Sequence, residues 1–205
     1  GPLSLGQLAR VIGEDEARLR EARALVAEVN LGATAIGTGI NAPAGYTGIV
    51  VPLLAQACGV PVVPAAHLVE ATQDTGAFVQ LSGVLKRVAC KLSKTCNDLR
   101  LLSSGPQAGF GDILLPARQA GSSIMPGKVN PVMSEALMQA CARVIGNDQC
   151  VAFSGATGGQ FELNIMMPVM GLATIESVDL LSASVKAFID FCAKDMEANR
   201  QACEK

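Results

Sequence analysis

Apolar residues recur every three or four positions along most of the chain, the spacing that places them on one face of a helix. The first such face is formed by Leu5, Leu8, Ile12, Leu19, Val26 and Val29. The charged run 14–23 fills the opposite positions, and we interpret it as the solvated face of the same helix. Three glycines in the segment 30–41 then interrupt the pattern, and a short helix is expected over about 48–58.

The strongest pattern is a heptad seam in the middle of the chain, which predicts a helix of roughly 30 residues. Its positions are Phe78, Leu81, Leu85, Val88, Leu92, Leu99 and Leu102, with Thr95 filling the remaining one. A second long helix is predicted from Pro131 towards Val151. A third should start near Leu163, kink at Pro168 and carry the apolar face Val178, Leu181, Val185, Phe188 and Cys192.

Three long helices with narrow apolar faces, and almost no strand pattern, predict an all-α fold built as a long-helix bundle. Aromatic residues make up 3% of the chain and tryptophan is absent, so aliphatic side chains must form the core. Seams of this length usually find partners across a subunit interface. A monomeric helical domain is the alternative.

Charge and composition exclude several kinds of partner. Charged residues are 17% of the chain and the net charge is −2, with no basic cluster of the kind that binds nucleic acid. The longest uncharged stretch, 29–66, is interrupted by four prolines and many glycines, so we do not expect it to enter a membrane. The low charge instead predicts extensive burial against other subunits or other parts of the polypeptide.

Cysteine usage indicates the compartment. The seven cysteines are scattered without a CxxC pair, as expected for buried thiols in a reducing cytoplasm: Cys58, Cys90, Cys96, Cys141, Cys150, Cys192 and Cys203. No cluster of metal ligands is evident, and we expect no cofactor. No signal peptide is recognisable at the start of the sequence.

The segment "GSSIMPGKVNP", residues 121–131, contains more chemistry than a linker needs. Asn130 followed by Pro131 is a strong helix start, and the amides and dipole of a helix N-terminus favour an anion. Lys128 adds a positive charge beside it, so this end is suited to a carboxylate or a phosphate. Ser122 and Ser123 precede a Pro-Gly turn, and a serine near a lysine and helix amides can act as a base. Solvent-facing turn serines are the alternative.

The same string resembles the signature of the fumarase/aspartase superfamily, Gly-Ser-Ser-x-Met-Pro-x-Lys-x-Asn, and matches it at every specified position. The resemblance extends to "NLGATAIGTGIN", "CNDLRLLSSGPQAG", "ARVIGND" and "GGQFELNIMMPVM". It implies that residues 1–205 are an incomplete central helical domain, without the N-terminal and C-terminal domains of the family. It also implies a homotetramer, in which each active site draws on three subunits, so the chain alone should be inactive.

Family members eliminate ammonia, water or an amine from a succinyl compound to give fumarate, through an aci-carboxylate intermediate. The resemblance implies that Ser122 is the general base and that Lys128 and Asn130 bind the carboxylates of a small dicarboxylate. Ser123 and Thr38, the latter in the Gly-Thr-Gly segment, are further candidates for substrate binding. Glu135 matches a glutamate that orients a histidine in fumarases.

Three departures from the family pattern are visible. That histidine is missing, because the single histidine, His67, has no motif around it and is expected to be a satisfied or a surface residue rather than a catalytic one. The family's Ser-x-Asn and Gly-Arg-Thr segments are also absent. Gln107 stands where members commonly carry a basic residue. The flanking segments look more like those of aspartate ammonia-lyases than those of fumarases, although "QFELN" is fumarase-like. The alternative from another class of function is a helical scaffold protein without catalytic activity.

Overall fold

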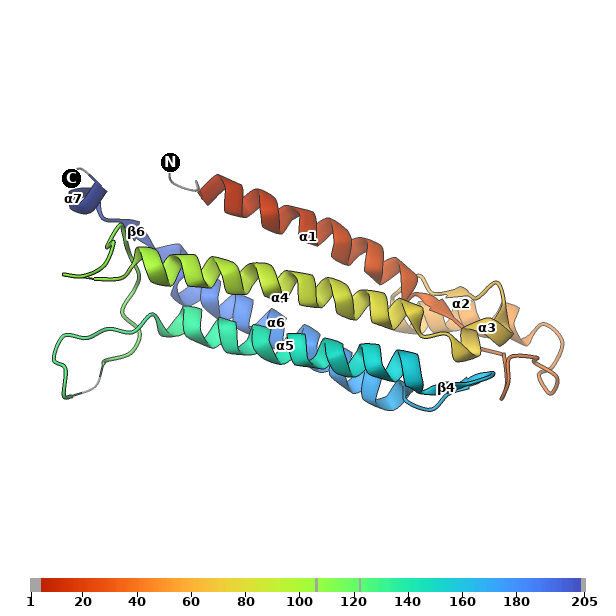
Figure 1. Ribbon diagram of the computed structural model, residues 1–205. Helices are drawn as coiled ribbons and strands as arrows, with labels where there is room; N and C mark the ends of the chain where they lie inside the picture. Colours follow the sequence, from red (N-terminus) through yellow and green to blue (C-terminus); the bar gives the residue numbers. More distant parts are fainter. Residues whose placement is uncertain (1–4, 106, 122, 204–205) are drawn as a thin grey trace. The chain divides into compact units, whose positions relative to one another are not determined.

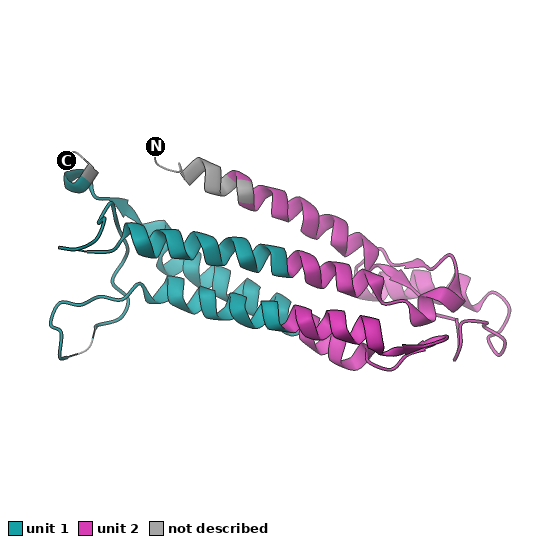
Figure 2. Cartoon of the chain, in the orientation of Figure 1, with its two compact units in different colours: residues 1–8, 86–146, 176–205 teal, residues 9–85, 147–175 magenta. Residues whose placement is uncertain are grey.

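The computed structural model describes residues 5–105, 107–121 and 123–203, and they form two compact units. Unit 1 contains residues 1–8, 86–146 and 176–205, and unit 2 contains residues 9–85 and 147–175 (Figure 2). Three long helices each contribute one part to each unit, namely α4 (Gly76–Leu102), α5 (Val132–Thr157) and α6 (Met167–Phe191) (Figure 1). The predicted all-α fold of long helices is confirmed.

In unit 1, α5 runs antiparallel to α4 and to α6 (Figure 1). The buried apolar side chains on these helices, and on the residue that follows α6, are Leu92, Cys96, Leu99, Leu137, Cys141, Val144, Leu181 and Cys192. After α4 the chain forms β3 (Ile113–Leu114), which pairs antiparallel with β6 (Glu197–Ala198). Between α6 and β6 lies the short 3-10 helix η1 (Ala193–Asp195), and α7 (Arg200–Cys203) follows β6.

Unit 2 contains α1 (Leu5–Leu25) from Ala9 onward, together with short elements around the other parts of the long helices. These elements are β1 (Glu28–Val29), α2 (Tyr46–Cys58), β2 (Val63–Pro64), α3 (Leu68–Gln73), β4 (Gly159–Gln160) and β5 (Leu163–Asn164). β1 and β2 are parallel, whereas β4 and β5 form an antiparallel hairpin. The apolar core joins Val151 on α5 to Met170 and Ala173 on α6, with Phe78 and Val79 of α4 against them.

Small residues form half of the buried seam of α4. Leu85, Leu92 and Leu99 are buried as the heptad pattern predicted, but the other buried positions of the seam are occupied by Ser82, Ala89 and Cys96. The predicted Leu81, Val88, Thr95 and Leu102 are only half-buried. Small side chains allow helix backbones to approach, so they lie at the centre of the contact while larger neighbours flank it.

The helix boundaries confirm most of the predicted pattern and correct the start of α6. The helix expected near Leu163 begins at Met167, because Leu163 pairs with Gln160 in the β4–β5 hairpin. Pro168 is therefore the second residue of α6, where a missing amide hydrogen leaves no helical hydrogen bond unmade. Within the described residues, every strand is two residues long, in agreement with the weak strand pattern.

The interpretation of 14–23 as a solvated face was wrong at two residues, one of them charged. Asp15 is only 3% exposed, and with Ala22 it forms the buried side of α1, seven residues apart. Ile12, predicted for the buried face, is exposed, and the side chains of Leu5 and Leu8 lie outside the described residues. A heptad pair of short side chains, rather than the larger aliphatic residues, thus faces the interior.

The prediction of buried thiols was right for three cysteines. Cys96, Cys141 and Cys192 are buried in unit 1, whereas Cys58 and Cys90 are exposed and Cys150 is half-buried. Burial raises the pKa of Cys96 to about 12, and burial also raises the pKa of Cys141 and of Cys192. All six are free thiols, and the side chain of Cys203 lies outside the described residues.

Candidate functional site

The signature segment forms a loop that closes on itself at its two ends. Ala120 and Val129 form an antiparallel bridge, and the Gly121 amide donates to the Lys128 carbonyl oxygen at 2.8 Å. A Cβ atom on Gly121 would lie 2.2 Å from that carbonyl oxygen, so glycine is required here. We call this closure, residues 120–121 with 128–129, the neck of the loop.

Beyond the neck the chain turns in solvent. The Lys128 amide donates to the Met125 carbonyl oxygen at 3.1 Å, and Gly127 has a φ of 82°, which a residue with a side chain rarely adopts. Ser123 and Lys128 are exposed, and Ile124 is 83% exposed. An isoleucine this open within a glycine-rich loop forms an apolar tip. Ser122 lies outside the described residues.

The loop leads directly into α5, but the helix begins one residue later than predicted. The Glu135 amide donates to the Pro131 carbonyl oxygen at 3.2 Å, which makes Pro131, and not Asn130, the capping position. The Asn130 carbonyl oxygen instead accepts from the Val132 amide at 2.8 Å. This tight turn leaves Asn130 outside the helix, next to the end at which helix amides favour an anion.

A cavity of about 480 Å³ lies at this junction within unit 1. Two predicted site residues line it, Asn130 and Glu135. Arg100 near the end of α4 also lines it, together with Ser103 and Ser104, which follow the helix. Backbone and side chains of β3 and of the following Leu115–Pro116 complete the wall. A cation, hydroxyl groups, an amide and a carboxyl group therefore share one concave surface, a composition suited to a small polar ligand.

Arg100 was not predicted as a site residue, yet its guanidinium group is the main cation of the cavity. One of its terminal nitrogens lies 3.7 Å from Glu135 Oε1, and the other donates to Asn97 Oδ1 at 3.4 Å. Its Nε is buried and has no hydrogen-bond partner. A buried N–H of a cation without an acceptor is energetically costly. No local signal in the sequence indicates that Arg100 lines a cavity, because it is not a position of the heptad seam.

The remaining predicted residues do not line this cavity. Ser123 lies in the exposed loop beyond the neck, and Lys128 belongs to the neck and is exposed; neither lines the cavity. Thr38 belongs to unit 2 and is exposed. The structure thus brings Asn130 and Glu135 together in one cavity, whereas Lys128 does not line that cavity.

The Gly-Thr-Gly segment in unit 2 has the tight backbone path that its glycines predicted. Gly37 and Gly39 have φ values of 86° and 64°, and the Gly39 amide donates to the Ala33 carbonyl oxygen at 2.8 Å. A Cβ atom on Gly37 would lie 2.2 Å from the Val69 Cα, so this glycine permits close contact with α3. His67, next to α3, is exposed, as expected.

None of the described helices has the length and apolarity needed to cross a membrane. Within the same residues, no group of three or more His, Cys, Asp or Glu side chains is arranged to hold a metal ion.

Comparison with known proteins identifies the family. The model of a family described as "Lyase" matches residues 1–146, and the chain belongs to this lyase family, as its resemblance to the fumarase/aspartase superfamily implied. An aspartate ammonia-lyase of Pseudomonas fluorescens is 52% identical over 209 residues, covering 100% of this chain and 44% of the relative. The chain therefore spans less than half the length of this relative.

Two solved structures are similar in fold. A fumarate lyase:delta crystallin from Brucella melitensis, bound to cobalt, has a TM-score of 0.93 and 48% identity, covering 98% of this chain and 44% of that one. A class II fumarase from Schistosoma mansoni has a TM-score of 0.91 and 30% identity, covering 98% of this chain and 45% of that one. The chain is thus similar in fold to a fumarate lyase:delta crystallin and to a class II fumarase.

Proposed function

We propose that this chain is the incomplete central helical domain of a lyase subunit that eliminates ammonia from L-aspartate to give fumarate. The observation that carries the proposal is the junction of the signature loop with α5, where Asn130 and Glu135 share a cavity with the Arg100 guanidinium group. The 52% identity to an aspartate ammonia-lyase over the whole chain supports this choice of leaving group.

The proposed reaction begins with Lys128 and Asn130 binding a substrate carboxylate. Ser122, as an alkoxide, takes a proton from the carbon next to that carboxylate, and the C–H electron pair moves into it to give the doubly charged aci-carboxylate. Return of this pair forms the carbon–carbon double bond and expels the ammonium group as ammonia with the C–N pair. The serine is left protonated. Because charge builds up on the carboxylate, nearby cations and helix amides stabilise the transition state more than the substrate.

The other predicted residues have supporting roles in the proposal. Ser123 contributes to binding beside the base, and Thr38 contacts substrate from the Gly-Thr-Gly segment. Glu135 orients a group supplied by another segment, since the chain's one histidine, His67, has no motif around it. With no second catalytic segment of the family in this sequence, we expect residues 1–205 alone to be inactive.

Fumarate hydratase is the second candidate. The similarity to the Schistosoma mansoni fumarase and the "QFELN" segment favour it. The two reactions use the same base and the same carboxylate-binding residues and differ in the leaving group. The same loop therefore serves either reaction.

We also propose a homotetramer in the cytoplasm. In unit 2, Ile49 and Leu53 are exposed one turn apart on α2, and Leu172 and Ile175 are exposed three residues apart on α6. Apolar helix faces of this kind are typical of subunit contacts. The six free cysteines suit a reducing compartment. Light scattering on the full-length protein should give four times the chain mass, and a monomer would contradict the assembly.

The test of function is a direct assay of the full-length protein. Supplied separately with L-aspartate and L-malate, it should form fumarate, followed by ultraviolet absorbance, from aspartate. Turnover of malate but not aspartate would favour fumarate hydratase. Turnover of neither would favour a non-catalytic scaffold.

The proposed binding of the substrate carboxylate by Lys128 has its own test. Lys128→Met should lower kcat/KM by about 10²–10³, because the lysine faces charge that grows in the transition state. The matched control is Lys94→Met, which removes an exposed lysine paired with Asp98 on α4. Equal activity of the two variants would remove Lys128 from the site.

A further inference from the structure

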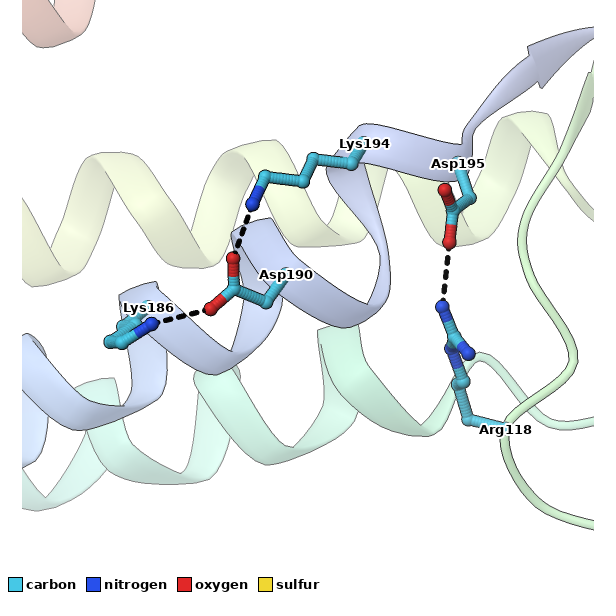
Figure 3. Close-up of polar contacts among 5 residues, drawn as sticks. All are labelled: Arg118, Lys186, Asp190, Lys194 and Asp195. Atoms are coloured by element: carbon cyan, nitrogen blue, oxygen red, sulfur yellow. Dashed lines mark hydrogen bonds and ion pairs between the residues drawn. The ribbon is translucent and has the colours of Figure 1, made fainter.

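Arg118 connects the segment before the signature loop to the end of α6. We call this segment, residues 111–118, the first arm of the loop. Arg118 Nε donates to the Phe191 carbonyl oxygen at 2.8 Å, and its Nη2 donates to Asp195 Oδ2 at 2.7 Å. The guanidinium carbon also lies 5.6 Å from the centroid of the Phe191 ring. Figure 3 shows Arg118 and Asp195 facing each other from the loop arm and from η1. Three contacts from one side chain fix its direction as well as its position.

The segment that carries Asp195, the acceptor of the Arg118 hydrogen bond, is itself fixed by further contacts. Asp190, near the end of α6, accepts from Lys186 and from Lys194, each at 2.6 Å (Figure 3). Hydrogen bonds from Lys186 and Lys194 lower the pKa of Asp190 to about 2. Lys194 thus links η1 back to α6, and the next residue, Asp195, receives Arg118. The turn after α6 is therefore held by two contacts, one between Lys194 and Asp190 and one between Arg118 and Asp195.

The same arm has a second attachment nearer its start. The Asn199 amide donates to the Asp112 carbonyl oxygen and its Nδ2 to the Gly111 carbonyl oxygen, both at 2.8 Å. The β3–β6 pairing lies between this point and Arg118. Residues 111–118 are therefore attached at both ends to residues 191–199, and all of these contacts lie within unit 1.

Arg118 lies two residues before Ala120, where the neck begins. The loop's other arm continues directly into α5 and is held by the helix. Each arm thus has an attachment of its own in addition to the neck that joins the two, and the Arg118 contact supports the arm that leads to the proposed base.

We propose that Arg118 is a positioning residue: its contacts with Phe191 and Asp195 hold the first arm of the signature loop in the place where the reaction needs it. The inference rests on the proposed function. It goes beyond it because Arg118 lies outside the signature and outside the cavity. Since Asn130 is fixed through α5, the role of Arg118 lies in the chemical step more than in substrate binding.

The test compares three variants of the full-length protein by hydrogen–deuterium exchange and by steady-state kinetics with L-aspartate. Arg118→Ala should raise amide exchange in residues 119–128 by about three- to tenfold, a modest change because the ion pair is partly exposed. It should lower kcat by about the same factor and leave KM within about twofold. Arg118→Lys keeps the charge but loses the planar fork, and should fall between Arg118→Ala and the parent.

Arg143→Ala is the matched control. Arg143 makes an exposed two-bond contact with Glu176 in the same unit, at 3.2 and 3.0 Å, away from the loop in sequence. This variant should change neither loop exchange nor kcat. Unchanged loop exchange in Arg118→Ala would overturn the inference, and so would raised exchange with an unchanged kcat.

Failure of the proposed function has a different signature. If the parent protein turns over neither aspartate nor malate, the proposed function fails. The Arg118 contact is then decided by exchange alone. A rise confined to 119–128 in Arg118→Ala keeps its role in holding the loop, and no rise ends it.

Discussion

Removing the Ser82 hydroxyl should destabilise unit 2 although it deletes only one oxygen atom. Ser82 on α4 donates to Asp148 Oδ1 on α5 at 2.9 Å, and both residues are about 4% exposed. Water cannot replace the lost donor at such a site, because the neighbouring seam is closely packed. Ser82→Ala thus leaves a buried carboxyl oxygen with one donor fewer.

The magnitude follows from two opposing terms. Loss of a buried hydrogen bond to a carboxyl group costs about 1.5–3 kcal/mol. Alanine is the better helix former by about 0.5 kcal/mol, which offsets part of this cost. The net loss should be about 1–2.5 kcal/mol. Ser182→Ala, at an exposed position of α6, has the same propensity gain without the buried bond and is the matched control.

The assay is urea unfolding followed by circular dichroism, with the same protein concentration for every variant, because subunit association, where it occurs, makes apparent stability depend on concentration. Ser82→Ala should unfold at lower urea than the parent, and Ser182→Ala at equal or slightly higher urea. Equal midpoints for the two variants would refute the reasoning. So would a Ser82→Ala variant more stable than the parent.

Three further predictions concern packing, thiols and pH. Gly155→Ala should cost about 1–3 kcal/mol in unfolding free energy, because its Cβ would lie 2.7 Å from a Val79 methyl group; Gly146→Ala, with nothing within 4 Å, should not. Cys58 should react with Ellman's reagent at pH 8 in the folded protein, whereas Cys96, whose pKa burial raises to about 12, should react only after unfolding. The lowered pKa of Asp190 means that its contribution to stability is present above its ordinary value of 3.8 and is lost as pH falls towards 2. Asp190→Asn should flatten this part of the acid unfolding curve.

The sequence predicted the long helices because heptad spacing is a local property of the chain. It misplaced half of the α4 seam, because spacing alone gives the large residues priority. Ala89 and Cys96 are buried because a neighbouring helix approaches them closely, and that neighbour lies far away in the sequence. The start of α6 was missed for a similar reason, since Leu163 takes part in a hairpin that apolar spacing does not reveal.

The site was predictable only where its chemistry is contiguous. The loop carries its serines, Lys128 and Asn130 within eleven positions, so a motif was sufficient to find them. Arg100 and Arg118 act through contacts with residues 35 or more positions away, namely Glu135 and Asp195, and no local pattern marks such pairs. Their roles depend on the fold and require a structure.

The central claim is that the signature loop supplies the base of an elimination reaction. Its most direct test is the kcat of Ser122→Ala in the full-length protein with L-aspartate as substrate. The proposal predicts a fall of at least about 100-fold with KM nearly unchanged, since a general base acts in the transition state. A kcat close to that of the parent protein would contradict it.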